Sequence, residues 1–182
     1  MILLDTLGRL LVVTDVFTGM MRDLLITMVS HSNLDKMTSQ KAFLKLLQKH
    51  EKAMIGTLRW SYFDELDIGL IYKIIRHFTF IQAPSRGWGY APTTGDITVS
   101  DDIERIRIVR NSLMHRPNPV LTEPQLDSMF ADFKDVSHRF DAYLNKDGTK
   151  GYQRAVDEYR TGPIDPELER KYREEIYKIE SI

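Results

Sequence analysis

The segment that decides the fold spans residues 101–116 and reads DDIERIRIVRNSLMHR. Its apolar residues recur at the spacing of an α-helix with one buried face. On an ideal helix this face is lined by Ile103, Ile106, Val109 and Leu113. Ser100 and the two acids supply a cap and a negatively charged first turn, and Pro117 and Pro119 stop the helix. We therefore predict a helix that runs to about His115.

The same period continues on both sides of this segment. It predicts a long first helix from Leu3 to about Met28, broken by residues 30–33. A second helix, capped by Thr38-Ser39, carries Phe43, Leu44, Leu46 and Leu47, and a less regular stretch follows it. Residues 66–80 form a central core helix, and a capping box of Thr122 and Gln125 opens another. No strand pair is expected, so the fold class is all-α.

Pro and Gly residues delimit the rest of the chain. Residues 83–96 are dense in both and predict a long ordered loop. After a turn at 146–148, we expect a short helix over 152–160 and a last helix that starts at Asp165-Pro166. The predicted organisation is a helical bundle over 1–145 and a C-terminal helical extension, or linker to further domains, over 146–182.

Composition narrows the class of protein. The 182 residues are 42% hydrophobic and 28% charged, which is typical of a folded globular domain. Cysteine is absent, which excludes disulfides and thiolate zinc sites and fits a reducing compartment. The N-terminus lacks the features of a signal peptide, and no apolar run is long enough to span a bilayer. We expect a cytoplasmic protein that does not enter a membrane.

Charge limits how such a protein could bind nucleic acid. The formal net charge is −1, so no global field attracts phosphate. Affinity must come from a local cluster of cations. One candidate is the polar side of the helix over 101–116, where Glu104, Arg107, Asn111 and His115 form one row and Arg110 lies beside it.

These residue types suit cleavage of RNA. A histidine can take a proton from a ribose 2′-hydroxyl or give one to the departing oxygen. An arginine can hold the phosphate and stabilise charge in the transition state, and an asparagine can orient either group. No metal or other cofactor is needed. The alternative is structural, because a histidine at a helix C-terminus interacts favourably with the helix dipole and surface arginines often serve only solubility.

Several motifs in order resemble one known family. They are residues 67–76 (DIGLIYKIIR), residues 83–88 (APSRGW), residues 95–98 (GDIT) and residues 102–111 (DIERIRIVRN), followed by His115. This arrangement resembles the HEPN domains of the DAZ-interacting zinc-finger ubiquitin ligase and its relatives. The resemblance covers about Leu3 to Tyr143 and touches the tail at Tyr152 and at residues 165–167.

The resemblance implies a bundle of four or five core helices that dimerises, so that two Arg-x4–6-His motifs face one cleft. Many members cleave RNA without metal and leave a cyclic phosphate, while others bind nucleotides or act as interaction modules. By position, Arg110 is the phosphate-binding arginine, His115 the catalytic histidine and Asn111 the polar residue beside the arginine. Four residues separate Arg110 from His115, whereas this subgroup often has a longer spacing. The two residues lie about 140° apart around an ideal helix, which is too far for one helix to direct both at one phosphate. Two helices that meet across the symmetry axis of a dimer could combine them.

Other residues have two interpretations each. Arg105, Arg107 and Arg116 could guide RNA, or could pair with the acids Asp101, Asp102 and Glu104 of the same helix. Trp88 could stack on a base, but we favour a role as an anchor, because a Pro-rich loop needs one.

Three functions remain open. The first is a homodimeric HEPN protein that binds RNA or a nucleotide and cleaves RNA through Arg110 and His115. The second is a non-catalytic assembly or sensor module of a larger innate-immune receptor or ubiquitin ligase, which the charged helix after Asp165 favours. The third is a toxin–antitoxin-like partnership with a nucleotidyltransferase, which no residue selects.

Overall fold

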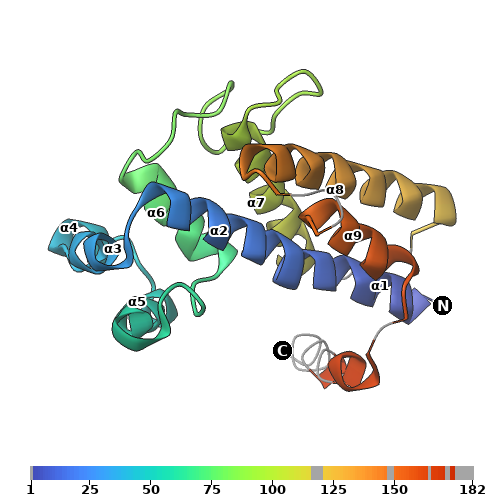
Figure 1. Ribbon diagram of the computed structural model, residues 1–182, viewed down its shortest axis with the longest axis horizontal. Helices are drawn as coiled ribbons and strands as arrows, with labels where there is room; N and C mark the ends of the chain where they lie inside the picture. The colour runs from blue at the N-terminus through green and yellow to red at the C-terminus, as the bar shows by residue number, and fades with distance from the viewer. Residues whose placement is uncertain (1, 116–120, 147–149, 164, 171–172, 175–182) are drawn as a thin grey trace. The chain divides into compact units, whose positions relative to one another are not determined.

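Helical periods dominate the sequence, and the computed structural model is all-α in the residues that it describes (Figure 1). These are residues 2–115, 121–146, 150–163, 165–170 and 173–174, without the side chains of residues 2–6, Met114 and His115. They contain nine α-helices and one π-helical segment, and no strand. The predicted all-α class is confirmed.

The chain divides into two compact units. Unit 1 consists of Met1–Val16 and Val109–Ile182, and unit 2 consists of Phe17–Ile108. The chain passes from one unit to the other within helical segments, first at the end of the π-helical η1 (Val12–Phe17) and then in the middle of α7 (Val99–His115). The predicted division at residue 145 stays a prediction.

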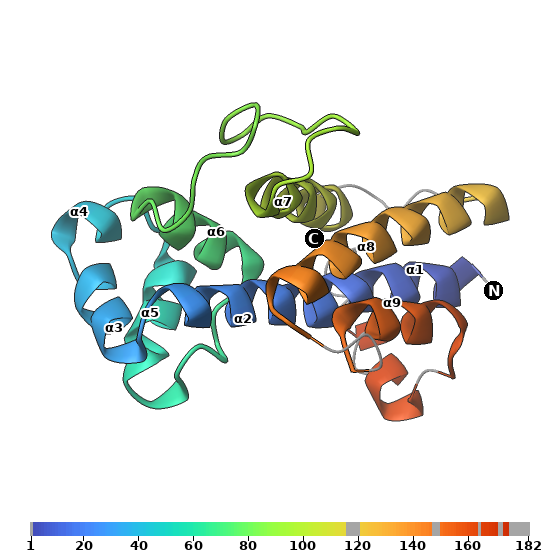
Figure 2. The same ribbon diagram turned by 45° about the horizontal axis from the view of Figure 1, so that its top comes forward.

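Unit 1 is built around α1 (Ile2–Leu11), α8 (Glu123–Tyr143) and α9 (Tyr152–Thr161). Figures 1 and 2 show α9 lying along α1 and α8, and it contacts both. Gly8 permits this packing, because a Cβ atom there would lie 2.9 Å from the carbonyl oxygen of Tyr159. The core of the unit is apolar and draws on all three helices, with Leu7, Leu11, Leu126, Phe130, Phe133, Val136, Phe140 and Val156 buried.

Side-chain caps start the two later helices of this unit. Thr122 and Gln125 form the predicted capping box at the start of α8, with the Gln125 side chain accepting from the backbone N–H of Thr122 at 2.9 Å. The first turn of α9 is capped from outside. The buried carboxylate of Asp141 accepts the backbone N–H groups of Tyr152 and Gln153 at 2.7 and 3.0 Å. Gly151 allows this approach, because a Cβ there would lie 2.4 Å from Asp141 Oδ2.

Unit 2 contains α2 (Thr18–Met28), α3 (His31–Thr38), α4 (Lys41–Leu44), α5 (Lys49–Ser61), α6 (Ile68–His77) and the first part of α7. The predicted core helix is α6, which Asp67 caps by accepting the N–H of Leu70 at 2.8 Å. It packs against α2, and α3 packs against α5. Six of the ten residues of α6 are buried, namely Ile68, Leu70, Ile71, Tyr72, Ile74 and Ile75, so α6 is the centre of this unit's core.

The sequence prediction was wrong for two helices of unit 2. The predicted break over residues 30–33 is confined to Val29 and Ser30, because residues 31–33 already belong to α3. Ser30 caps α3 by accepting the N–H of Asn33 at 3.3 Å. The stretch predicted to be less regular contains α5, whose first turn is held by Glu51 accepting the N–H of Gln48 at 2.8 Å. The apolar period of α5 is blurred, because Trp60 lies on the exposed side while Glu51 is buried. In addition, α4 begins after Gln40 rather than after Thr38-Ser39.

The tail begins as predicted. Asp165 Oδ1 accepts the N–H of Glu167 at 3.0 Å, and residues 166–170 are helical. Among the described helices, none has both the length and the apolar character needed to cross a membrane.

The cap at Asp141 predicts a stability effect. We expect Asp141→Ala to lower the free energy of unfolding by about 2–3 kcal/mol, because two backbone donors of a helix start would lose a charged acceptor. Urea unfolding measures the change, and hydrogen exchange of the amides of α9 locates it. Asp135→Ala is the matched control, because it removes an exposed carboxylate from α8, the helix that also carries Asp141. Equal exchange protection of α9 in both variants would contradict this role for Asp141.

Candidate functional site

Helix α7 carries the candidate site, and a reciprocal cap starts it. Asp101 Oδ2 accepts the backbone N–H and the hydroxyl of Thr98 at 2.9 and 2.7 Å, while Thr98 Oγ1 accepts the N–H of Asp101 at 3.2 Å. The cap is therefore Thr98, two residues before the predicted Ser100, which lies inside the first turn. The two predicted first-turn acids, Asp101 and Asp102, are confirmed and both are fully buried.

Asp101 also attaches the long loop to α7. Its carboxylate accepts the backbone N–H of Ser85 at 2.7 Å and the Ser85 hydroxyl at 2.8 Å. Burial by itself would raise the pKa of Asp101, but the hydrogen bonds from Thr98 and Ser85 favour the charged form more strongly and lower the pKa below its ordinary value. The charged carboxylate is thus a stable anchor for the loop near neutral pH.

One turn further along α7, Glu104 is fully buried and fully hydrogen-bonded. Its Oε1 accepts from the Tyr72 hydroxyl of α6 at 2.6 Å and from the backbone N–H of Gly89 at 2.9 Å. Its Oε2 accepts from Nε of Arg107 at 2.7 Å. This one carboxylate therefore joins α6, the loop and α7, and its charge is balanced by the Arg107 guanidinium.

Glu104 with Tyr72, Gly89 and Arg107 forms what we call the Glu104 cluster. Aromatic contacts extend it. Trp88 packs edge-on against Tyr72, with ring centroids 5.5 Å apart, and the Arg107 guanidinium lies 5.5 Å from the centre of the Tyr72 ring. Trp88 has the contact expected of a loop anchor. Burial, together with the hydrogen bond to Glu104, raises the pKa of Tyr72 to about 12, so this phenol keeps its proton throughout the physiological range.

Arg105 and Arg107 each pair with an acid of the same helix, which was one of the two roles considered for them. Arg105 forms an ion pair with Asp102 at 2.9 Å and donates to the carbonyl oxygen of Thr93 at 2.7 Å. Arg107 pairs with Glu104 at 2.7 Å. Both arginines therefore help to hold the loop or the buried acids, and a contribution of either to RNA binding stays a prediction.

The three motif residues occupy the last part of α7. Arg110 and Asn111 are both half-buried, and the Arg110 guanidinium donates to Oδ1 of Asn111 at 3.2 Å. His115 is the last residue of α7, but its side chain lies outside the described residues, as does all of Arg116. The described contact thus brings together two of the three predicted site residues. Among the described residues, no group of three or more His, Asp or Glu could hold a metal ion.

Sequence reasoning missed two members of the buried cluster. Tyr72 was placed on the apolar face of its helix, and Asp101 was assigned to the first turn and to a possible ion pair with an arginine of the same helix. Signals for both were present. A buried tyrosine hydroxyl usually finds a hydrogen-bond partner, and Thr98 with Asp101 has the spacing of a reciprocal cap. The contact between α6 and α7 joins residues 32 positions apart, which no local pattern can predict.

A comparison with protein-family models supports this resemblance. A family model described as DZIP3/hRUL138-like HEPN matches residues 24–172. The chain belongs to the DZIP3/hRUL138-like HEPN family. The family inferred from sequence is confirmed. The match begins at Leu24 rather than at about Leu3, and it extends beyond Tyr143 to include α9. No curated protein and no solved structure matches the chain.

The residues matched by the family model include the whole candidate site. The matched region contains α7 entirely, with Arg110, Asn111 and His115 at its end. It also contains every contact of the Glu104 cluster. In this HEPN chain, the helix that carries the motif is therefore the helix to which the long loop is attached.

The Glu104 cluster predicts a stability effect that depends on pH. We expect Tyr72→Phe to cost about 1–3 kcal/mol at pH 7, because the buried carboxylate loses a donor. An unfolded tyrosine loses its proton near pH 10, whereas Tyr72 keeps its proton to about pH 12. This stabilisation is therefore fully present below about pH 10 and is lost as the pH rises towards 12.

Urea unfolding at pH 7 and at pH 10.5 measures the effect. The difference between wild type and Tyr72→Phe should be smaller at the higher pH. Tyr90→Phe, at a tyrosine of the long loop that is 67% exposed, is the control and should match wild type at both pH values. A constant difference at the two pH values would contradict a raised pKa for Tyr72.

Proposed function

We propose that this HEPN domain binds single-stranded RNA and, as a homodimer, cleaves it without a metal ion through Arg110 and His115. The observation that carries the proposal is the Arg-Asn-x3-His sequence at the end of α7 in a chain of this family. HEPN domains are often ribonucleases, so the family makes RNA the first partner to test.

The chemistry assigns one role to each residue. A base removes the proton from a ribose 2′-hydroxyl, the 2′-oxygen attacks the neighbouring phosphorus, and the bond to the 5′-oxygen breaks. The departing oxygen takes a proton, so the products are a 2′,3′-cyclic phosphate and a 5′-hydroxyl, and no water is consumed. His115 moves the protons, because imidazole titrates near neutral pH. Arg110 holds the phosphate and offsets its growing negative charge.

Asn111 is a positioning residue in this scheme. Its Oδ1 accepts a hydrogen bond from the Arg110 guanidinium at 3.2 Å. A guanidinium held by a neighbouring amide loses less rotamer freedom when it binds phosphate. Asn111 therefore restricts the orientations that the Arg110 guanidinium adopts before it binds the phosphate.

A homodimer accounts for the spacing of the motif. Residues five positions apart lie about 140° apart around a helix axis, so Arg110 and His115 of one helix do not point at one phosphate. Two copies related by a twofold axis can supply an arginine and a histidine to the same cleft, and such isologous interfaces are the commonest in homodimers.

Four further residues are proposed to contribute to RNA binding, with different weight. Arg116 carries its charge next to the motif in sequence. Arg105 and Arg107 hold ion pairs with buried acids, and Trp88 packs on Tyr72. RNA contact by these three would be secondary to their role in attaching the loop.

A second candidate is a non-catalytic assembly module of a larger protein. The observation that favours it is the pairing of Arg105 with Asp102 and of Arg107 with Glu104. Because these two arginines are neutralised by acids, they contribute less to the binding of RNA phosphates by α7. A dimer without nuclease activity would fit this candidate.

The deciding experiment compares wild type with Arg110→Ala/His115→Ala on labelled single-stranded RNA in EDTA, followed by analysis of the product ends. We expect wild type to cut and to leave a cyclic phosphate, and the double variant to lose at least 100-fold in rate, because a positioned acid–base group alone contributes about 10²–10⁴-fold. A substrate with 2′-O-methyl groups should resist cleavage, because it has no nucleophile.

The control is Ser112→Ala, which changes an exposed side chain between the motif residues and should retain full activity. If wild type, shown to be dimeric by light scattering, cuts no RNA in a broad panel, the nuclease proposal fails and the assembly module is preferred.

A further inference from the structure

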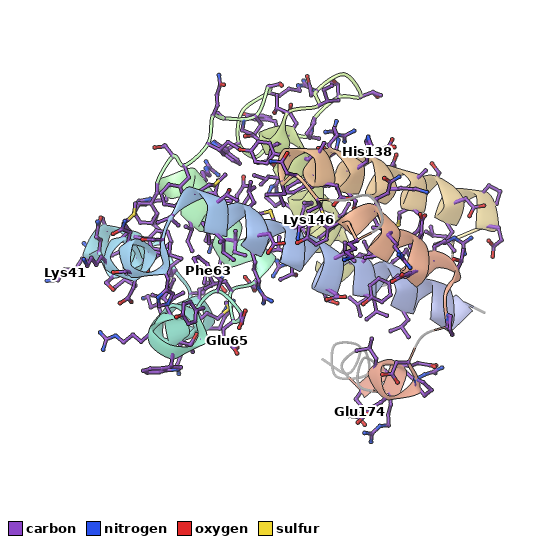
Figure 3. All side chains as sticks on the ribbon, in the orientation of Figure 1. Lys41, Phe63, Glu65, His138, Lys146 and Glu174 are labelled. Atoms are coloured by element: carbon purple, nitrogen blue, oxygen red, sulfur yellow. The ribbon has the colours of Figure 1, made fainter. Side chains whose placement is uncertain are left out.

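Helix α5 has an outward face that the core does not use. Its buried side consists of Glu51, Ile55 and Leu58. The opposite side is exposed and spans an arc of about 120° on an ideal helix, with Lys49, Lys52, Ala53, Gly56, Arg59 and Trp60 on it. We call these six residues the α5 face. Figure 3 shows side chains projecting away from the outer side of α5.

The α5 face is cationic and carries no acid. Its three charged residues are Lys49, Lys52 and Arg59, and no ion pair within the described part of the chain involves any of them. The one acid of the helix, Glu51, is buried and is paired with Lys73 of α6 at 2.7 Å. Asp64 and Glu65 follow the helix rather than lie on it. In a chain of net charge −1, this concentration of positive charge favours an anionic partner.

Trp60 makes this face more specific than a solvated row of lysines. Its side chain is 74% exposed, which is unusual because tryptophan is highly buried on average. Between Trp60 and the lysines lie only the small residues Ala53 and Gly56, and a Cβ at Gly56 would meet open space. The indole therefore stands beside a low surface flanked by cations, where a planar group can stack on it.

A second exposed aromatic follows directly. Tyr62 is 64% exposed and has a φ of 52°, a conformation that strains a bulky residue and that glycine would adopt freely. Its ring lies against His31, with centroids 4.5 Å apart. A large aromatic held at a strained, exposed position is a feature that functional surfaces retain and that folding alone would not select.

We propose that the α5 face binds single-stranded RNA, with Lys49, Lys52 and Arg59 contacting phosphates and Trp60 stacking on a base. Cations that follow a backbone and an aromatic on which bases stack are the two components of sequence-tolerant single-strand binding. The face is about 16 Å long, which suits a short run of nucleotides. The proposal goes beyond the cleavage proposed above, because binding on α5 requires neither Arg110 nor His115.

Other anionic partners fit the α5 face less well. An acidic membrane would need a broad apolar side on the helix, but the apolar side of α5 is already buried in unit 2. An acidic peptide would satisfy the cations and leave the indole without a stacking partner. Duplex nucleic acid would offer phosphates but no unstacked bases.

The test uses fluorescence anisotropy of a labelled single-stranded 2′-O-methyl oligonucleotide of about ten nucleotides, which the proposed nuclease cannot cut. We expect Trp60→Ala to weaken binding roughly 5- to 150-fold and Trp60→Phe to weaken it less. We expect Lys49→Gln/Lys52→Gln/Arg59→Gln to flatten the plot of log affinity against log salt by about two. All these side chains are exposed, so the melting temperatures of the variants should match that of wild type.

Matched controls separate a local from a global effect. Tyr90→Ala removes another exposed aromatic, and Lys134→Gln/Arg154→Gln/Arg173→Gln removes the same charge from other helices. Both controls should bind within twofold of wild type. Equal binding by wild type and the α5 variants would overturn the proposal, as would equal losses in the control variants, or a Trp60-dependent affinity for phosphatidylserine vesicles or polyglutamate without affinity for the oligonucleotide.

The two proposals fail separately in this experiment. Arg110→Ala/His115→Ala removes the proposed phosphate contact of Arg110 but none of the α5 face, so Trp60→Ala should weaken oligonucleotide binding by the same factor in this background as in wild type. If this double variant loses binding while the α5 variants keep it, the α5 proposal is wrong and the nuclease proposal is untouched. If the α5 variants lose binding and wild type cuts no RNA, the α5 proposal holds and the nuclease proposal fails.

Discussion

The arrangement of unit 2 around α7 depends on one buried carboxylate. Glu104 is fully removed from solvent, and a buried charge is tolerated only when hydrogen bonds and an opposite charge replace the lost water. Tyr72, the backbone of Gly89 and Arg107 supply these partners from a core helix, a loop and α7 itself. Satisfying Glu104 therefore determines where the loop attaches, and it holds the Tyr72 ring where Trp88 can pack on it.

The cations of α7 and those of α5 differ in whether they have acidic partners. Arginines in the first half of α7 neutralise buried acids and hold the loop. The cations of α5 have no such partner within the described residues. Positive charge near the motif is thus largely used for folding, whereas positive charge on α5 remains available to a ligand. An overall charge near zero hides this separation, because it averages a neutralised helix with a cationic one.

Helices α6 and α8 were predicted well from the sequence, whereas α5 was not. The core helix α6 and the long α8 each bury a broad apolar stripe, and their caps at Asp67 and Thr122 follow common patterns. Helix α5 was missed because its period is interrupted by a buried glutamate and an exposed tryptophan. Its cap also begins with Gln48, which is not among the residues preferred at that position. Trp60, one of the residues that conceal α5 from sequence reasoning, is also part of its candidate binding face.

The sequence by itself determined the all-α class, the motif of Arg110, Asn111 and His115, the helix on which it lies and the family to which the chain belongs. These follow from residue order and local spacing, because helix formation and capping depend on neighbours within a few positions. Only the tertiary structure decided which distant segments the buried acids of α7 join. The pairing of Tyr72 with Glu104, and of Asp101 with Ser85, joins residues 32 and 16 positions apart, and such contacts form only when the burial of apolar faces brings distant segments together.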